Sequence, residues 1–244
     1  MNPSTRATAT FAAATVVAVT GYFGTRYLAI GVSAVIALAA FGWPRLLRVY
    51  HRRVSSTIIA ATGAISVVAV GLGRGEPYLR YAVAAAAAAV LMSLGAEVFF
   101  PSPPGRAVTS VTGMMAGALV AVSASAWVAA NRTPGAADLV VAGAAAIAVT
   151  GIVSVLTRSA TVNAVAGLVL GTACGGALGY TLDSISWGGG ALVGVVGAAS
   201  VVIVNELVTR EPSPRHVMAA IASGITPVLS AGVLVYLGGR LLVG

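Results

Sequence analysis

Two glutamates in this 244-residue chain lie inside long apolar segments, where a carboxylate can accept protons or gate a path. An arginine follows each of them nine residues later, which gives the pairs Glu97–Arg106 and Glu206–Arg215. The second pair repeats the first at an offset of 109 residues, and each intervening turn contains proline. A charged group inside a membrane is costly, and it usually has a partner or a function. The pattern predicts either gating or proton-accepting carboxylates, or ion pairs that fix two turns.

The last apolar segment contains a proline that could break a helix. Pro227 has no N–H group to donate, and Gly224 before it permits a kink or an unwound turn. A broken helix in a membrane exposes backbone dipoles that can bind a solute. Proline is also tolerated as a simple kink, so the predicted break at Gly224 and Pro227 has both a functional and a structural interpretation.

Another apolar segment carries glycine at every fourth position, which places these residues on one face of a helix. We call this set the glycine ridge, and it consists of Gly167, Gly171, Gly175 and Gly179. Because glycine lets two helix backbones approach closely in lipid, the ridge predicts a tight helix–helix contact. The partner helix could belong to the same molecule, to a second copy or to another membrane protein.

Motifs of the common soluble enzymes are missing from the chain. It has no phosphate-binding GxxxxGK[ST], no HExxH and no GxSxG sequence, and no cluster offers three metal ligands. Its single cysteine, Cys174, excludes an intrachain disulfide and a multi-cysteine metal site. We therefore expect neither enzymatic activity nor a bound cofactor.

The elements that must position these residues follow from the composition. The chain is 58% hydrophobic and only 8% charged, whereas soluble domains carry about 25% charged residues. Such a chain is expected to be an all-α polytopic membrane protein in contact with the lipid bilayer. The net charge of +8 does not indicate nucleic-acid binding, because the arginines lie singly or in short groups at the ends of apolar segments.

Apolar runs separated by glycine- and proline-rich turns predict nine transmembrane helices within a single domain, 1–244. The predicted helices are 7–24, 27–43, 54–73, 78–100, 107–130, 138–157, 161–182, 189–209 and 216–239.

The distribution of arginine predicts how these helices are oriented. With the N-terminus inside, nine arginines lie on the cytoplasmic side and five outside, so the positive-inside rule favours a multi-pass protein of the cytoplasmic membrane with its N-terminus in and its C-terminus out. Four of the cytoplasmic arginines cluster in one short turn and could attract anionic lipid. They are Arg45, Arg48, Arg52 and Arg53.

The offset of 109 residues extends beyond the two glutamate–arginine pairs. It also aligns Trp127 with Tyr236, and it maps the block 54–130 onto the block 163–239 without a gap. The offset spans an even number of predicted helices, so both copies would have the same orientation in the membrane. This pattern predicts a parallel internal repeat, an arrangement found in some transporters.

Together these features favour a small permease for a neutral, zwitterionic or lipidic solute. Its path is expected between the two blocks, lined by the glycine ridge, the Pro227 break and the glutamate–arginine pairs. The alternative is a non-catalytic membrane scaffold subunit of an envelope-assembly or secretion complex, because the expected interior lacks charge at mid-membrane and little of the chain lies outside the membrane.

Overall fold

The computed structural model describes residues 3–73, 75, 77–133, 137–182, 185–209 and 216–243. Within these ranges the chain forms nine α-helices and no strand. They are α1 (Pro3–Phe23), α2 (Thr25–Leu46), α3 (Arg52–Leu72), α4 (Arg80–Phe99), α5 (Ala107–Arg132), α6 (Ala137–Val153), α7 (Ala160–Thr181), α8 (Trp187–Thr209) and α9 (Val217–Val243). Every predicted helix has a counterpart whose ends lie within four residues of the predicted ones.

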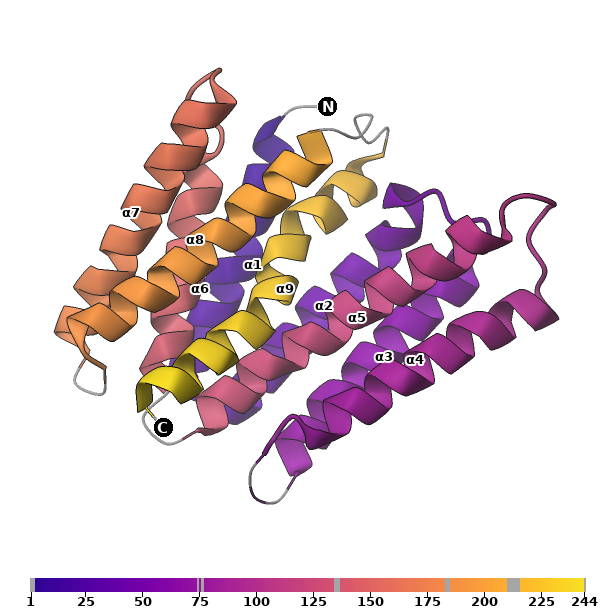
Figure 1. Cartoon of the computed structure of the whole chain (residues 1–244), viewed down its shortest axis with the longest axis horizontal. Coiled ribbons are helices and arrows are strands. Elements are labelled where there is room, and N and C mark those ends of the chain that lie inside the picture. Colours follow the sequence, from indigo (N-terminus) through magenta and orange to yellow (C-terminus); the bar gives the residue numbers. More distant parts are fainter. Residues whose placement is uncertain are drawn as a thin grey trace.

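Consecutive helices run in opposite directions, so the chain passes back and forth along one bundle (Figure 1). Helix α9 lies inside this bundle and packs against α1, α2, α5 and α8. Helices α4 and α7 lie at opposite edges, where α4 packs on α3 and α5 and α7 packs on α6 and α8. The interior is therefore organised around the last helix of the chain.

Seven of the nine helices are long and apolar enough to cross a membrane, namely α2, α3, α4, α5, α7, α8 and α9. This supports a multi-pass membrane protein, whereas nine spans were predicted. Helix α6 has 17 residues and a length of about 26 Å, and most of its residues are buried. Helix α1 is rich in threonine and carries Arg6, which lowers its apolar character.

Helix α6 ends at Val153, four residues before the predicted end at residue 157. The side chain of Asn163, on the next helix, organises the intervening turn. Its Nδ2 donates to the carbonyls of Ser154 and Thr157, at 3.0 and 2.9 Å, and its Oδ1 accepts from the backbone N–H of Thr157 at 3.0 Å. These bonds supply partners for backbone groups that would otherwise end unpaired at the helix terminus.

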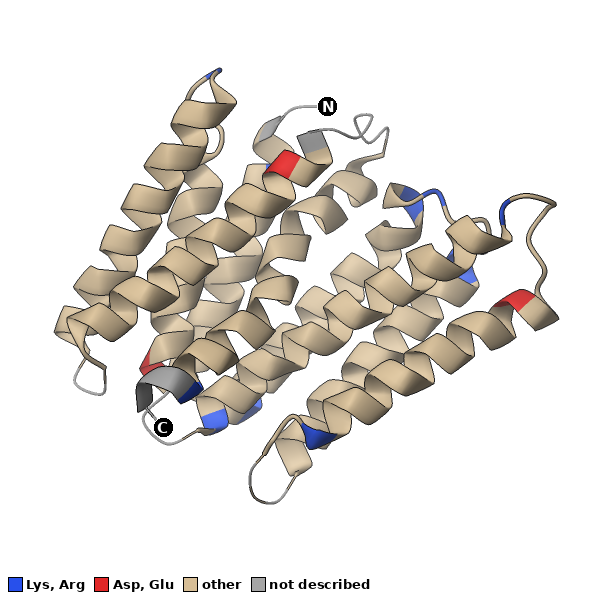
Figure 2. Ribbon diagram, in the orientation of Figure 1, with Lys and Arg blue, Asp and Glu red and all other residues tan. Residues whose placement is uncertain are grey.

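The charged residues gather at the two ends of the bundle (Figure 2). The end that holds the start of α1 is called the Arg-rich end, because seven of the described arginines lie there and four lie at the opposite end. The seven are Arg6, Arg45, Arg48, Arg52, Arg53, Arg106 and Arg158, and the four are Arg26, Arg80, Arg132 and Arg240. The asymmetry expected from the sequence is therefore present within the described residues.

The two blocks aligned by the 109-residue offset have helices of matching position but different packing. Shifting the bounds of α3, α4 and α5 by this offset gives those of α7, α8 and α9 to within two residues. Helix α3 packs directly on α5, whereas in the described residues α7 has no comparable contact with α9 and packs on α6 and α8 instead.

Candidate functional site

Helix α9 contains the predicted break, but it is helical over its whole described length, with Pro227 inside it. The unwound turn considered for Gly224 and Pro227 is therefore not present. One physical reason is that a neighbouring helix bonds to the backbone near the proline, as is usual for prolines in membrane helices. The hydroxyl of Thr10 on α1 donates to the carbonyl of Gly224 at 2.6 Å. An added β-carbon at Gly224 would meet the carbonyl of Arg6, so glycine is required for this close approach.

The part of α9 that follows Pro227 is bonded to α5. The indole Nε1 of Trp127, which is fully buried, donates to the carbonyl of Val228 at 2.8 Å. The hydroxyl of Ser123 donates to the carbonyl of Ser230 at 3.1 Å. The two halves of α9 are thus held by different neighbours, α1 before the proline and α5 after it.

An apolar groove of about 500 Å³ lies between α1, α2 and α9 at the Arg-rich end of the bundle. Three residues of α1 contribute hydroxyl groups to the lining, and alanine, valine, leucine and isoleucine side chains make up the rest. The lining includes Ser4, Thr5, Thr8, Ala12 and Val16 of α1, Val35 and Leu38 of α2, and Ile221 and Ile225 of α9. The groove therefore ends less than one turn before Pro227, and its walls suit a hydrocarbon group better than a polar solute.

The glycine ridge forms the tight contact that its spacing predicted, and the partner helices belong to the same molecule. The four ridge glycines are the buried residues of α7. A β-carbon at Gly175 would lie 2.8 Å from the Cα of Gly194 on α8, and one at Gly171 would lie 2.5 Å from the hydroxyl oxygen of Thr150 on α6. The ridge is thus filled by backbone and side chains and does not line the groove.

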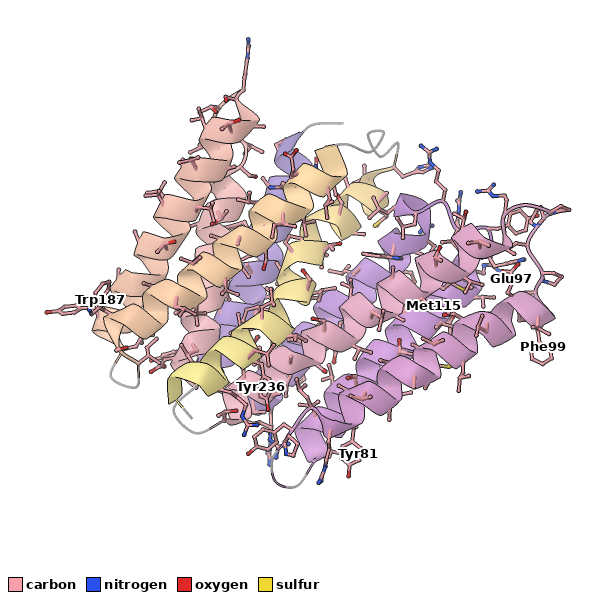
Figure 3. The ribbon with its side chains drawn as sticks, in the orientation of Figure 1. Tyr81, Glu97, Phe99, Met115, Trp187 and Tyr236 are labelled. Atoms are coloured by element: carbon pink, nitrogen blue, oxygen red, sulfur yellow. The ribbon has the colours of Figure 1, made fainter. Side chains whose placement is uncertain are left out.

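The first glutamate–arginine pair is not formed, because each side chain has other partners. The carboxylate of Glu97 accepts from the backbone N–H of Ser102 at 2.6 Å and from its hydroxyl at 3.0 Å. Arg106 donates to the carbonyl of Arg48 at 3.0 Å. Figure 3 shows Glu97 at the end of α4, near the edge of the bundle and close to Phe99. The carboxylate therefore fixes its own turn, and Arg106 joins two loops at the Arg-rich end.

The second pair is only partly described. Glu206 lies on α8 and has interactions with other groups, whereas Arg215 lies outside the described residues. Helix α8 packs on α6, α7 and α9, and α4, which carries Glu97, packs on α3 and α5. The two glutamates are therefore at the same end of the bundle but not in one site, and neither is among the residues that line the groove.

The arginine cluster between α2 and α3 points outward from a fixed corner. Arg48 adopts a left-handed backbone conformation with φ of 54°, and the next residue, Val49, is buried against Ile58 and Met114. Arg48, Arg52 and Arg53 are exposed. The anchored valine holds these guanidinium groups at the bundle surface, where lipid headgroups would lie.

Sequence reasoning missed the contact between Arg6 and Asn205. The guanidinium Nη2 of Arg6 donates to Asn205 Oδ1 at 2.7 Å, and its buried Nε has no partner in the described residues. Arg6 is one of the nine arginines that the sequence places on the cytoplasmic side, and its position four residues before Thr10 on a threonine-rich helix is the signal that could have indicated a polar face. The groove could not be predicted from the sequence, because its alanines and valines do not differ in type from other membrane-facing residues.

No model of a known protein family, no curated protein and no solved structure matches this chain.

Proposed function

We propose that the chain is a small permease of the cytoplasmic membrane that moves a neutral, zwitterionic or lipidic solute. The observation that carries this proposal is the groove between α1, α2 and α9. Its volume of about 500 Å³ lies within the usual range for small-molecule sites, about 300–1,000 Å³. Because its lining is mostly apolar and its polar side chains are the hydroxyls of Ser4, Thr5 and Thr8, it favours a solute with a hydrocarbon part.

The construction of α9 supports a movement that would open and close this groove. Ile221 and Ile225 precede Pro227 and belong to the groove wall, while the carbonyl of Val228 follows the proline and is bonded to α5. Pro227 removes one backbone hydrogen bond between these two parts, which makes this the place where the helix bends most easily. A shift of the first part relative to α1 and α2 would change the groove without disturbing the contact with α5.

The proposed orientation places the groove in the cytoplasmic half of the membrane, since the Arg-rich end would face inward.

The proposed parallel repeat is supported by the contact between α5 and α9. Ser123 and Gly232 are equivalent under the 109-residue offset, and a β-carbon at Gly232 would lie 2.6 Å from the carbonyl oxygen of Ser123. Two copies related by an axis along the membrane normal would meet in this way, at equivalent positions.

Transfer of a labelled zwitterionic phospholipid between the leaflets of proteoliposomes tests the lipidic form of the proposal. We expect wild-type protein to accelerate transfer over protein-free vesicles and Ala12→Phe, which fills the groove, to reduce the protein-dependent rate at least tenfold. Ala88→Phe is the matched control, because Ala88 is an exposed residue of α4 and no residue of α4 lines the groove. Wild-type protein that transfers the lipid no faster than empty vesicles would rule out this form.

The scaffold alternative is favoured by the hydroxyl groups inside the bundle. Those of Thr62, Ser93 and Ser200 donate to carbonyls of their own helices, so their protons are not available to a passing solute. Purification in mild detergent separates the two functions. A stable, stoichiometric complex with another membrane protein, combined with no solute or lipid movement, would favour the scaffold.

A further inference from the structure

Aromatic and cationic side chains from three elements meet at the end of the bundle opposite the Arg-rich end. Tyr78 lies between α3 and α4, Arg132 lies in the last turn of α5, and Tyr236 and Arg240 lie near the end of α9. We call these four residues the Tyr–Arg cluster. Figure 3 shows Tyr236 at this end of the bundle, and the guanidinium of Arg240 lies beside its ring.

Tyr236 carries a buried hydroxyl group that lacks a partner. Its side chain is only 4% exposed, and its Oη has no hydrogen-bond partner in the described residues. Trp127 occupies the equivalent position under the 109-residue offset. Its indole N–H donates to a backbone carbonyl, whereas the hydroxyl of Tyr236 has no such partner. A buried donor is costly to leave unpaired, so a phenol rather than a phenylalanine at this position needs an explanation.

Arg132 brings an uncompensated positive charge to the cluster. Its Nη1 donates to the carbonyls of Val70 and Gly71, the latter at 2.8 Å, and its guanidinium lies over the ring of Tyr78 at 4.6 Å. All of these partners are neutral, and both bonds use Nη1, which leaves Nη2 and Nε for another acceptor.

Each tyrosine of the cluster lies beside one arginine. The guanidinium of Arg132 lies over the ring of Tyr78, that of Arg240 lies 5.9 Å from the ring centre of Tyr236, and both tyrosines belong to or pack against the same buried core. A phenol that has a proton to donate therefore belongs to the same cluster as a guanidinium group with free nitrogens, that of Arg132. This combination suits a ligand that accepts hydrogen bonds and carries negative charge.

We propose that the Tyr–Arg cluster binds a phosphate group, with the Tyr236 hydroxyl and the free nitrogens of Arg132 as donors. Guanidinium favours phosphate because its planar N–H groups match the spacing of the phosphate oxygens. The phosphate belongs either to a phospholipid headgroup of the leaflet at this end or to a soluble oxyanion. The site is separate from the groove and does not depend on the proposed transport.

The test uses the full chain, freed of lipid, in micelles of dodecyl maltoside, a detergent without phosphate, and follows thermal unfolding by tryptophan fluorescence. One arm adds inorganic phosphate to these micelles, with sodium chloride of equal ionic strength as reference. The other arm adds phosphatidylglycerol to the micelles. We expect the unfolding temperature of the wild type to rise in one arm, which identifies the source of the phosphate group.

Tyr236→Phe is the decisive variant, because it removes only the unpartnered hydroxyl. We expect it to fold as well as the wild type in the phosphate-free micelles and to bind phosphate or phosphatidylglycerol about tenfold more weakly, as loss of one hydrogen bond to a charged group predicts. Tyr180→Phe is the matched control, since Tyr180 is 84% exposed near the same end of the bundle. A wild type that responds in neither arm, or a Tyr236→Phe variant that responds as the wild type does, overturns the proposal.

Discussion

Helices α3 and α7 bury the same face with residues of very different size. The buried positions 58, 62, 66 and 70 of α3 align, at the 109-residue offset, with the four glycines of the ridge on α7. On α3 these positions hold isoleucine, threonine, serine and valine, and the helix packs on α5 through side chains. On α7 glycine admits the backbone of α8 and a threonine of α6.

The comparison shows that the periodicity of a helix and its choice of neighbour are separate properties. The four-residue spacing fixes which face is buried in both blocks. The volume at these positions then decides whether a side chain or a backbone can occupy the contact. Similar helix lengths and aligned buried faces are therefore compatible with two different arrangements of three helices.

The largest expected effect comes from giving α7 the residue that α3 has at the aligned position. Gly175→Ser adds a β-carbon 2.8 Å from the Cα of Gly194 and against the carbonyl of Gly190, and neither backbone atom can rotate away. We expect it to lower the free energy of unfolding by about 3 kcal/mol. Denaturation of the purified protein in detergent measures this loss.

Ala177→Ser is the control for this substitution, because Ala177 lies on the exposed side of α7. It introduces the same side chain into the same helix without the backbone contact. If Gly175→Ser proves as stable as Ala177→Ser, the ridge does not carry the packing assigned to it.

Much of this contact could be predicted from the sequence, and part of it could not. The spacing of Gly167, Gly171, Gly175 and Gly179 was sufficient to predict a close helix contact, because few other patterns place four glycines on one face. The partner was not predictable, since glycine removes side chains and thereby any information on what fills the space. The same reasoning explains why the groove, which alanine and valine line, had no signature.

The partners of the charged residues Glu97 and Arg106 could not be predicted from the sequence, for a different reason. Glu97 and Arg106 are close in sequence, and opposite charges at such spacing often pair. The turn after α4 instead presents the N–H and hydroxyl of Ser102 to the carboxylate, while Arg106 reaches a carbonyl of another loop. Charge type alone could not distinguish these outcomes, because backbone groups compete for both side chains.

A second comparison sets the aligned residues Trp127 and Tyr236 side by side. Trp127→Phe removes the donor to the carbonyl of Val228 and leaves a small cavity in the core, so we expect a loss of about 1–3 kcal/mol in the free energy of unfolding. Tyr236→Phe removes a hydroxyl that has no partner in the described residues and is expected to cost nothing in detergent micelles without phosphate ligands. Equal losses for the two variants would show that the aligned positions do not differ as described.

The smallest effect is expected at the side-chain bond that links α3 to α5 and has no counterpart on α7. The hydroxyl of Ser66 donates to that of Ser125 at 2.8 Å, and both residues are fully buried. A double-mutant cycle with Ser66→Ala and Ser125→Ala should give a coupling energy of about 0.6 kcal/mol, the usual value for such bonds between membrane helices. The value is small because the hydroxyl of Ser125 also bonds to the carbonyl of Val122 in its own helix and keeps that partner when Ser66 is removed.

Ser93→Ala paired with Ser125→Ala is the reference cycle, since Ser93 donates to a carbonyl of α4 itself and should show no coupling. A coupling energy of zero for Ser66 and Ser125 would mean that shape alone holds α3 on α5, and the two blocks would then differ only in side-chain volume.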